Sequence, residues 1–474
     1  MSAVLPWQRV GVSRVIDARP NLRAPDLRAE ATVAEFKGEI SMFTRFRSMS
    51  ATAMAAVLGC ALMTTALPAA AKEKPKKGEE EKGQGLSASK GFAPALKKMT
   101  EATTAKDAAA LQAALTEGQG AATTPDDKYL AAFYQLQLGI LNKDQAIQAQ
   151  ALDAMLDSGR TPPENLAVYN FFSGNFAYGA KDYPKAIKRL EAAKAAGSTE
   201  PNVPVLLMDS YLNAGQVDQG LATAKAAIEA SRAAGQRPSD ELYVRPVKAL
   251  QAAKRTNEVL DLMTMRLRDY NQPTVWRQTL FIALQANQDK EVGLDIFRLM
   301  RATGAMQERP EYAEYAALAT EAALPGEVVS LIKAGKQGGV IPASDAKFNE
   351  LLTSQTERMG DEESTLTAYA QKPSTLSNPK VAGATGDAMV GYGRYADAIP
   401  LYKAALAAGG DKDLWTYRLG VAQAQSGDVA GAKASFAQVT GSRKRLADLW
   451  TVKIDTPAAA PAAATPAAAP ATSG

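Results

Sequence analysis

A pattern that repeats every 34 residues limits the folds open to this chain. Small, turn and large apolar residues of one unit recur in the next, pairing Gly386 with Gly420, Gly393 with Gly427, Ala398 with Ala432 and Tyr402 with Phe436. A fixed period of this length is typical of stacked helix–turn–helix hairpins. One hairpin cannot bury its own apolar stripe, so each must pack on the next. The pattern therefore predicts an all-α fold, a right-handed α-solenoid.

Each recurring position has an expected role. The first glycine of each unit, Gly386 or Gly420, is expected where the two helices of a hairpin approach closely. The second, Gly393 or Gly427, is expected in the turn, where a positive φ favours glycine. The large aromatic residue that follows should fill the layer between neighbouring hairpins.

The repeat array is predicted to span 167–446, with about seven to eight repeats, some of them degenerate. Its first clear unit covers 167–200. After a short insertion the phase resumes at Val259, Gly293 and Glu327, again 34 residues apart.

Other helices and tails are expected around this array. Apolar spacing in 91–166 predicts helical hairpins or degenerate repeats, and 443–455 is predicted to form a capping helix. The charged segment 72–90 has the composition of a disordered linker. The Ala/Pro-rich segment 456–474 is expected to be a flexible tail.

Residues 42–71 resemble a secretory signal peptide. Basic residues precede an apolar run, and Ala69 and Ala71 form a cleavage-site pattern before Lys72. Residues 1–41 would then be an upstream extension translated in error. A transmembrane anchor is the alternative, although the run is rich in Ala and Thr and ends at the cleavage-like pattern.

A second form of processing stays open at Cys60. The sequence Val57-Leu58-Gly59-Cys60 resembles a bacterial lipobox, although Leu58 departs from the small or β-branched residue usual there. Lipidation of this cysteine would give an outer-membrane lipoprotein. Cleavage before Lys72 would instead give a soluble periplasmic protein.

The composition removes most catalytic chemistry. The chain has no histidine and one cysteine, Cys60, so it has no imidazole acid–base catalyst and no disulfide within the chain. We therefore predict no catalytic residue, no cofactor and no metal site. The net charge is only +4, which gives no electrostatic case for binding nucleic acid.

Three short motifs are interpreted as structural. Gly391–Ala396 matches G-x-G-x-x-A, but a dinucleotide site needs a preceding strand, and this segment falls in a repeat turn. Asp361–Glu363 should complement the dipole at the start of a helix. Arg443–Arg445 is interpreted as a solvated face of the last helix.

From 167 to 446 the chain resembles the tetratricopeptide repeat family, through Gly174 with Ala186 and the paired glycines and alanines of the last two units. The resemblance implies a groove lined by the first helix of each repeat. Carried onto this sequence, its partner-binding positions are Phe171, Asn175, Tyr178, Asp209, Gln278, Gln285 and Tyr417.

The stretch from Tyr395 to Trp450 is similar to the end of tetratricopeptide proteins that accompany TonB–ExbB–ExbD systems in Gram-negative bacteria. This likeness implies a periplasmic helper of outer-membrane uptake, with TonB, ExbB or ExbD components as partners. We therefore expect a non-enzymatic scaffold that binds a protein or peptide, with an envelope-assembly lipoprotein as the alternative.

Overall fold

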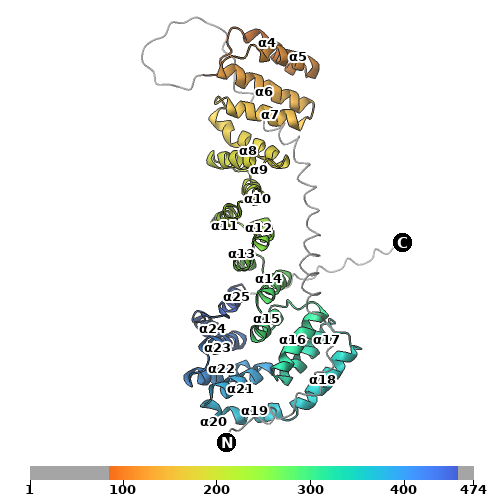
Figure 1. Cartoon of the computed structure of the whole chain (residues 1–474), viewed down its shortest axis with the longest axis vertical. Coiled ribbons are helices and arrows are strands. Elements are labelled where there is room, and N and C mark those ends of the chain that lie inside the picture. The colour runs from red at the N-terminus through yellow and green to blue at the C-terminus, as the bar shows by residue number, and fades with distance from the viewer. Residues whose placement is uncertain (1–84, 457–474) are drawn as a thin grey trace, which may run out of the picture. The chain divides into compact units, whose positions relative to one another are not determined.

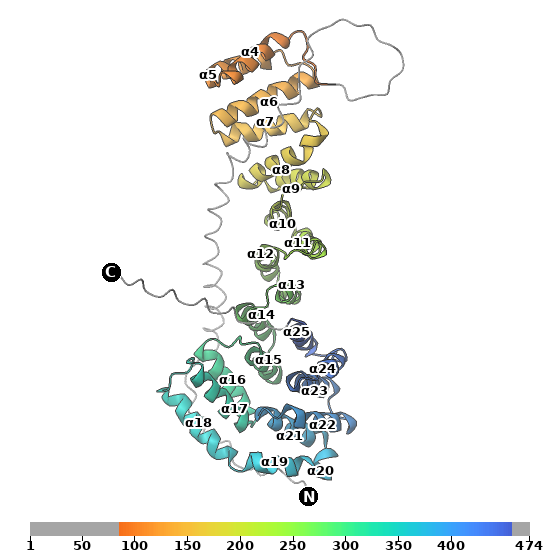
Figure 2. The same ribbon diagram turned by 180° about the vertical axis from the view of Figure 1, so that it is seen from behind.

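The computed structural model describes residues 85–456. The predictions for the upstream extension, the signal peptide with its cleavage site (Ala69, Ala71, Lys72), the lipidation site Cys60 and the tail beyond residue 456 lie outside the described residues. Within 85–456 the chain forms 22 helices and no strand (Figures 1 and 2), so the predicted all-α solenoid is confirmed.

The helices fall in two compact units, whose described parts are 85–249 and 250–456. Helix α12 (Glu241–Ala252) crosses the boundary between them. The N-terminal unit contains α4 (Ala93–Thr104), α5 (Ala108–Gln119), α6 (Pro125–Leu141), α7 (Gln145–Asp157), α8 (Pro163–Gly179), α9 (Tyr183–Ala195), α10 (Val203–Asn213) and α11 (Val217–Ala233).

The C-terminal unit continues the same alternation of paired helices. We call the first helix of each pair the A helix and the second the B helix. The unit contains α13 (Thr256–Asp269), α14 (Pro273–Ala286), α15 (Lys290–Ala302), α16 (Arg309–Glu321), α17 (Pro325–Gln337), α18 (Ala346–Met359), α19 (Glu362–Ala370), α20 (Pro373–Leu376), α21 (Pro379–Gly391), α22 (Tyr395–Ala407), α23 (Lys412–Ser426), α24 (Val429–Phe436) and α25 (Lys444–Asp455).

The turn inside most of these hairpins places one residue at a positive φ, and the α14–α15 turn is an exception. Gly393 (φ 73°) and Gly427 (φ 90°) occupy this place, as predicted. In the first three hairpins a lysine occupies it instead: Lys106, Lys143 and Lys181 have φ of 54°, 55° and 64°. The left-handed conformation costs a non-glycine residue about 1 kcal/mol. The aspartate after each lysine accepts a backbone N–H of the next helix, which offsets part of that cost.

The close approach of the two helices in the last repeats is also as predicted. A Cβ built on Gly420 would lie 2.6 Å from the ring of Phe436, so only glycine fits there without movement of that ring. The ring of Phe436 stacks on Trp450, with centroids 6.3 Å apart, and so bridges to the next helix. The preceding unit repeats this arrangement. A Cβ built on Gly386 would lie 2.8 Å from the ring of Tyr402, whose centroid is 6.0 Å from that of Trp415.

The last helix, α25, packs on helices from both ends of its unit. It contacts its neighbours α23 and α24, and also α13 and α15. Arg443, just before α25, is buried and donates to Asp295 at 2.8 Å and to Glu291 at 3.3 Å, while Arg445 pairs with Asp261. The predicted solvated face is therefore wrong for Arg443, because the unit turns back on itself and covers it, whereas Arg445 is paired but stays partly exposed.

Candidate partner-binding surface

Four of the predicted partner-binding residues lie in the N-terminal unit, on α8 and α10. Phe171 is buried and packs in a core cluster. Tyr178 is half-buried, and its hydroxyl donates to Asp209 Oδ2 at 3.1 Å. Asp209 also pairs with Arg245 on α12. The structure thus brings Tyr178 and Asp209 into one polar chain that links three successive A helices.

Burial and the nearby arginine shift the pKa of Asp209 in this polar chain in opposite directions. Burial raises the pKa of Asp209 above the usual value, although Arg245 beside it favours the ionised form. Burial also raises the pKa of Tyr178, and the nearby Asp209 carboxylate adds to that shift. The tyrosine hydroxyl therefore stays protonated at neutral pH and serves as a hydrogen-bond donor.

Asn175 occupies the same helix as Tyr178 and is half-buried. Asn170, elsewhere on α8, donates to the Leu166 carbonyl at 2.9 Å. Among residues 85–456 no protein group hydrogen-bonds the side-chain amide of Asn175. Partly buried apolar side chains of α6 and α8, including Phe172, flank the core beneath this helix. This face of α8 therefore offers apolar surface together with an amide donor and acceptor.

The three remaining predicted residues lie in the C-terminal unit and are placed differently from one another. Gln278 accepts a hydrogen bond from Arg266 at 2.7 Å. Gln285 is exposed near the end of α14. Tyr417 is only 1% exposed, and its hydroxyl accepts from Trp450 Nε1 at 3.0 Å. In this conformation Tyr417 cannot touch a partner.

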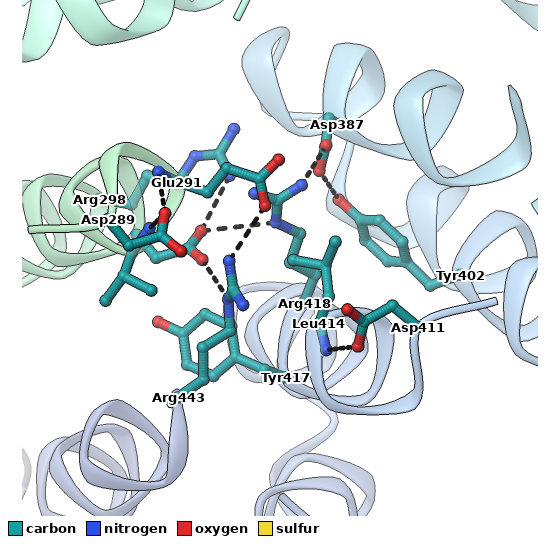
Figure 3. A network of polar contacts seen from close by, with 12 residues as sticks. Asp289, Glu291, Arg298, Asp387, Tyr402, Asp411, Leu414, Tyr417, Arg418 and Arg443 are labelled. Carbon is teal, nitrogen blue, oxygen red and sulfur yellow. Dashed lines mark hydrogen bonds and ion pairs between the residues drawn. The ribbon is translucent and has the colours of Figure 1, made fainter. Parts of the chain in front are cut away.

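Tyr417 lies beside a buried network of charges that includes Arg298, Arg418 and Arg443 (Figure 3). Asp295, on α15, is 1% exposed and pairs with all three arginines. Its carboxylate accepts from Arg443 Nε at 2.8 Å and from Arg298 Nη1 at 3.2 Å, and it lies 3.5 Å from Arg418 Nε. Burial opposes ionisation of Asp295, but Arg418, Arg298 and Arg443 together hold its pKa below the usual value.

Two further carboxylates complete the network. Asp387 pairs with Arg418 and accepts from the Tyr402 hydroxyl at 2.8 Å. Burial raises the pKa of Asp387, although Arg418 favours its ionised form. Glu327 accepts hydrogen bonds from Nε and Nη2 of Arg298, at 2.9 and 2.8 Å. Burial alone would raise the pKa of Glu327, but the charge and hydrogen bonds of Arg298 outweigh burial and lower it. Three carboxylates thus face three guanidinium groups, which balances the buried charge.

The space within this network is small. A cavity of about 10 Å³, lined by Asp295, Tyr417, Arg418 and Val421 among others, leaves room for about one water molecule. No peptide or cofactor fits there. In the described part of the chain, no helix is long and apolar enough to cross a bilayer, and no three His, Cys, Asp or Glu side chains gather as metal ligands.

Sequence reasoning did not find this network. Glu327 is the third residue after the N-cap of α17, a place that Asp397 and Gly431 hold in α22 and α24. Those two residues are not buried, so the charge of Glu327 gave no signal of a buried partner. The partners come from other repeats, so the period alone could not identify them.

Comparison with known proteins shows no family for this chain. No protein-family model and no curated protein matches it. Similar solved structures include Naa15/Naa10 bound to HypK-THB (10% identity, 75% of this chain, TM-score 0.34), the apo form of the quorum sensor NprR from B. thuringiensis (14%, 67%, 0.25) and the pentatricopeptide repeat protein PPR10 from maize (14%, 77%, 0.29).

The aligned part of the chain spans 63% of the Naa15/Naa10 chain, 98% of the NprR chain and 56% of the PPR10 chain. The helices and the internal period make this a helical-repeat protein.

Proposed function

We propose that this protein is a non-enzymatic scaffold that binds a protein or peptide partner on the α8 face of its N-terminal unit. The observation that carries the proposal is the contrast between the two units. Asn175 keeps an unengaged amide beside partly exposed apolar side chains. Its counterpart on α23, Val421, follows Gly420 as Asn175 follows Gly174, and it is 8% exposed and lines the small cavity of the charge network. Surface of this mixed kind suits an extended peptide, whose backbone needs amide partners.

The proposed location is the periplasm of a Gram-negative bacterium. The signal-like segment 42–71 and the likeness of the last repeats to proteins accompanying TonB–ExbB–ExbD systems support it. The protein would then assist TonB-dependent uptake across the outer membrane. The lipobox-like sequence at Cys60 supports the alternative, an outer-membrane lipoprotein that aids envelope assembly.

An in-cell crosslink tests the partner and the surface together. A photoreactive amino acid replaces Asn175 in the full chain, and captured proteins are identified by mass spectrometry. Lys188, exposed on α9 of the same unit, carries the same amino acid as the matched control. Recovery of TonB, ExbB or ExbD homologues from position 175 alone supports the uptake role.

Other outcomes separate the alternatives. Capture of envelope-assembly factors from position 175 would remove the uptake role and keep the scaffold. Equal capture from both positions would contradict a binding surface on α8. Mass spectrometry of the mature N-terminus distinguishes the two locations, since Lys72 indicates the soluble form and an acylated Cys60 the lipoprotein.

A further inference from the structure

The polar contacts that close the C-terminal unit separate the two signs of charge. One side, on α13 and α15, contributes carboxylates, and the other side, on α23 and around α25, contributes guanidinium groups. We call this set the ionic seam: Asp261, Glu291 and Asp295 on the acidic side, and Arg418, Arg443 and Arg445 on the basic side.

The basic side of the ionic seam is anchored to its own neighbours in the chain. Trp450 of α25 stacks on Phe436 and donates to Tyr417. Arg418 keeps a second partner, Asp387 on α21, outside the ionic seam. Since stacked repeats are stabilised chiefly by adjacent units, α23–α25 can hold together without the contacts to α13 and α15.

The contacts across the ionic seam join residues far apart in sequence. Arg443 and Asp295 are 148 residues apart, and Arg445 and Asp261 are 184 apart. Asn271, just before α14, also donates to the carbonyl of Thr456, just after α25. These contacts add a closure to an array whose other contacts are mostly local.

We infer that the C-terminal unit opens along the ionic seam, and that the closed form covers the A-helix face of the last repeat. Opening separates α23–α25 from α13 and α15 and uncovers Tyr417 and Val421, which line the cavity beside Asp295. A surface that the closed form withholds from partners becomes available. Its use by a partner rests on the proposed function, whereas the opening itself does not.

Thiol labelling of two adjacent positions tests the opening. Val421 is 8% exposed and faces the ionic seam, whereas Ala422 is 0% exposed and packs in the core shared by α21, α22 and α23. Val421→Cys therefore reports opening, and Ala422→Cys reports unfolding of the repeat. The full chain is used with Cys60→Ser, which removes its one other cysteine, and an uncharged maleimide measures the rate.

Arg443→Met weakens the buried part of the ionic seam. Loss of one member of a buried ion pair shifts such an equilibrium by about 100-fold or more. We expect labelling at position 421 to accelerate by about that factor, with position 422 unchanged. An unchanged rate at 421, or equal acceleration at both positions, would overturn the inference.

A charge reversal at the exposed edge provides the second variant. Asp261 and Arg445 are both partly exposed, so reversing one should leave the fold intact. Asp261→Arg places two like charges together and should accelerate labelling at 421 by about two- to fivefold. Adding Arg445→Asp restores the pair and should restore the parent rate. Failure of the single change to accelerate labelling, or of the double change to restore it, counts against the ionic seam.

Discussion

Replacement of Glu327 by alanine distinguishes a prediction made by aligning the repeats from one made from the structure. Glu327 is the third residue after the N-cap of α17, and the equivalent residues of α22 and α24, Asp397 and Gly431, are exposed and half-buried. Alignment of the repeats therefore predicts a surface position at 327 that tolerates alanine. The structure predicts the opposite. Glu327 is 3% exposed and accepts from both Arg298 Nε and Nη2 and from the Tyr315 hydroxyl, at 2.9, 2.8 and 2.6 Å.

The size of the effect follows from what Glu327→Ala leaves behind. The Arg298 side chain is 9% exposed and would retain only Asp295 as an ionic partner at close range. Breaking a buried pair by removing one member costs about 3–5 kcal/mol. The Tyr315 hydroxyl loses its acceptor as well, at about 1 kcal/mol. The loss is a large fraction of the roughly 5–15 kcal/mol that stabilises a typical domain.

Urea unfolding followed by tryptophan fluorescence measures the lost stability in the C-terminal unit, which contains Glu327. Trp276, Trp415 and Trp450 all lie in the C-terminal unit, and the fourth tryptophan, Trp7, lies outside the described residues. We expect the unfolding midpoint to fall sharply in Glu327→Ala. Circular dichroism of the whole chain should retain a transition from the N-terminal unit.

Two control variants identify the buried charge as the cause. Glu327→Gln keeps the shape and an acceptor for Tyr315 but removes the charge, so it should lose most of the same stability. Arg298→Met combined with Glu327→Ala removes both charges of the pair. The double variant should recover part of the lost stability, because the guanidinium that Glu327→Ala leaves buried without its partner is gone. A Glu327→Ala protein as stable as the parent would refute the reasoning.

Three further predictions concern other features. Gly420→Ala forces the phenyl ring of α24 to move and should destabilise the C-terminal unit by about 1–3 kcal/mol in the same urea experiment. Lys181→Gly relieves a left-handed backbone and should stabilise the N-terminal unit by about 0.5–1 kcal/mol, measured by circular dichroism during thermal unfolding. Acid should destabilise the C-terminal unit, because the lowered pKa values of Asp295 and Glu327 give stability that is lost as pH falls through them. The raised pKa of Asp387 acts in the opposite direction, since the folded state takes up that proton more readily, so Asp387→Asn should make the loss in acid steeper in urea titrations at several pH values.

Local repeat geometry could be predicted from the sequence because it depends on residues within one period. Gly420 and Gly427 have the close approach and the positive φ expected of them. Helical hairpins were expected in this N-terminal region, but the positive φ of Lys106 and Lys143 was not, because lysine in that conformation leaves no pattern that distinguishes it from an exposed helical residue.

Contacts between distant repeats could not be predicted from a period. Arg443 looked like a surface charge because its partner, Asp295, lies 148 residues earlier. Tyr417 looked accessible because an A-helix position normally faces an open groove, whereas here α15 and α25 together cover it. The local pattern specifies a single hairpin. The curvature that brings the two ends of the C-terminal unit together is the sum of small rotations over many hairpins.

Closure along the ionic seam also restricts how this gene can change. An open array tolerates the gain or loss of a whole hairpin, since each unit contacts only its neighbours. Here Arg443 must reach Asp295 across the intervening hairpins, so one hairpin more or fewer would displace one side of the contact from the other. Residues 250–456 are therefore expected to vary among descendants of this protein by substitution rather than by duplication, while the N-terminal unit has no such constraint among its described contacts.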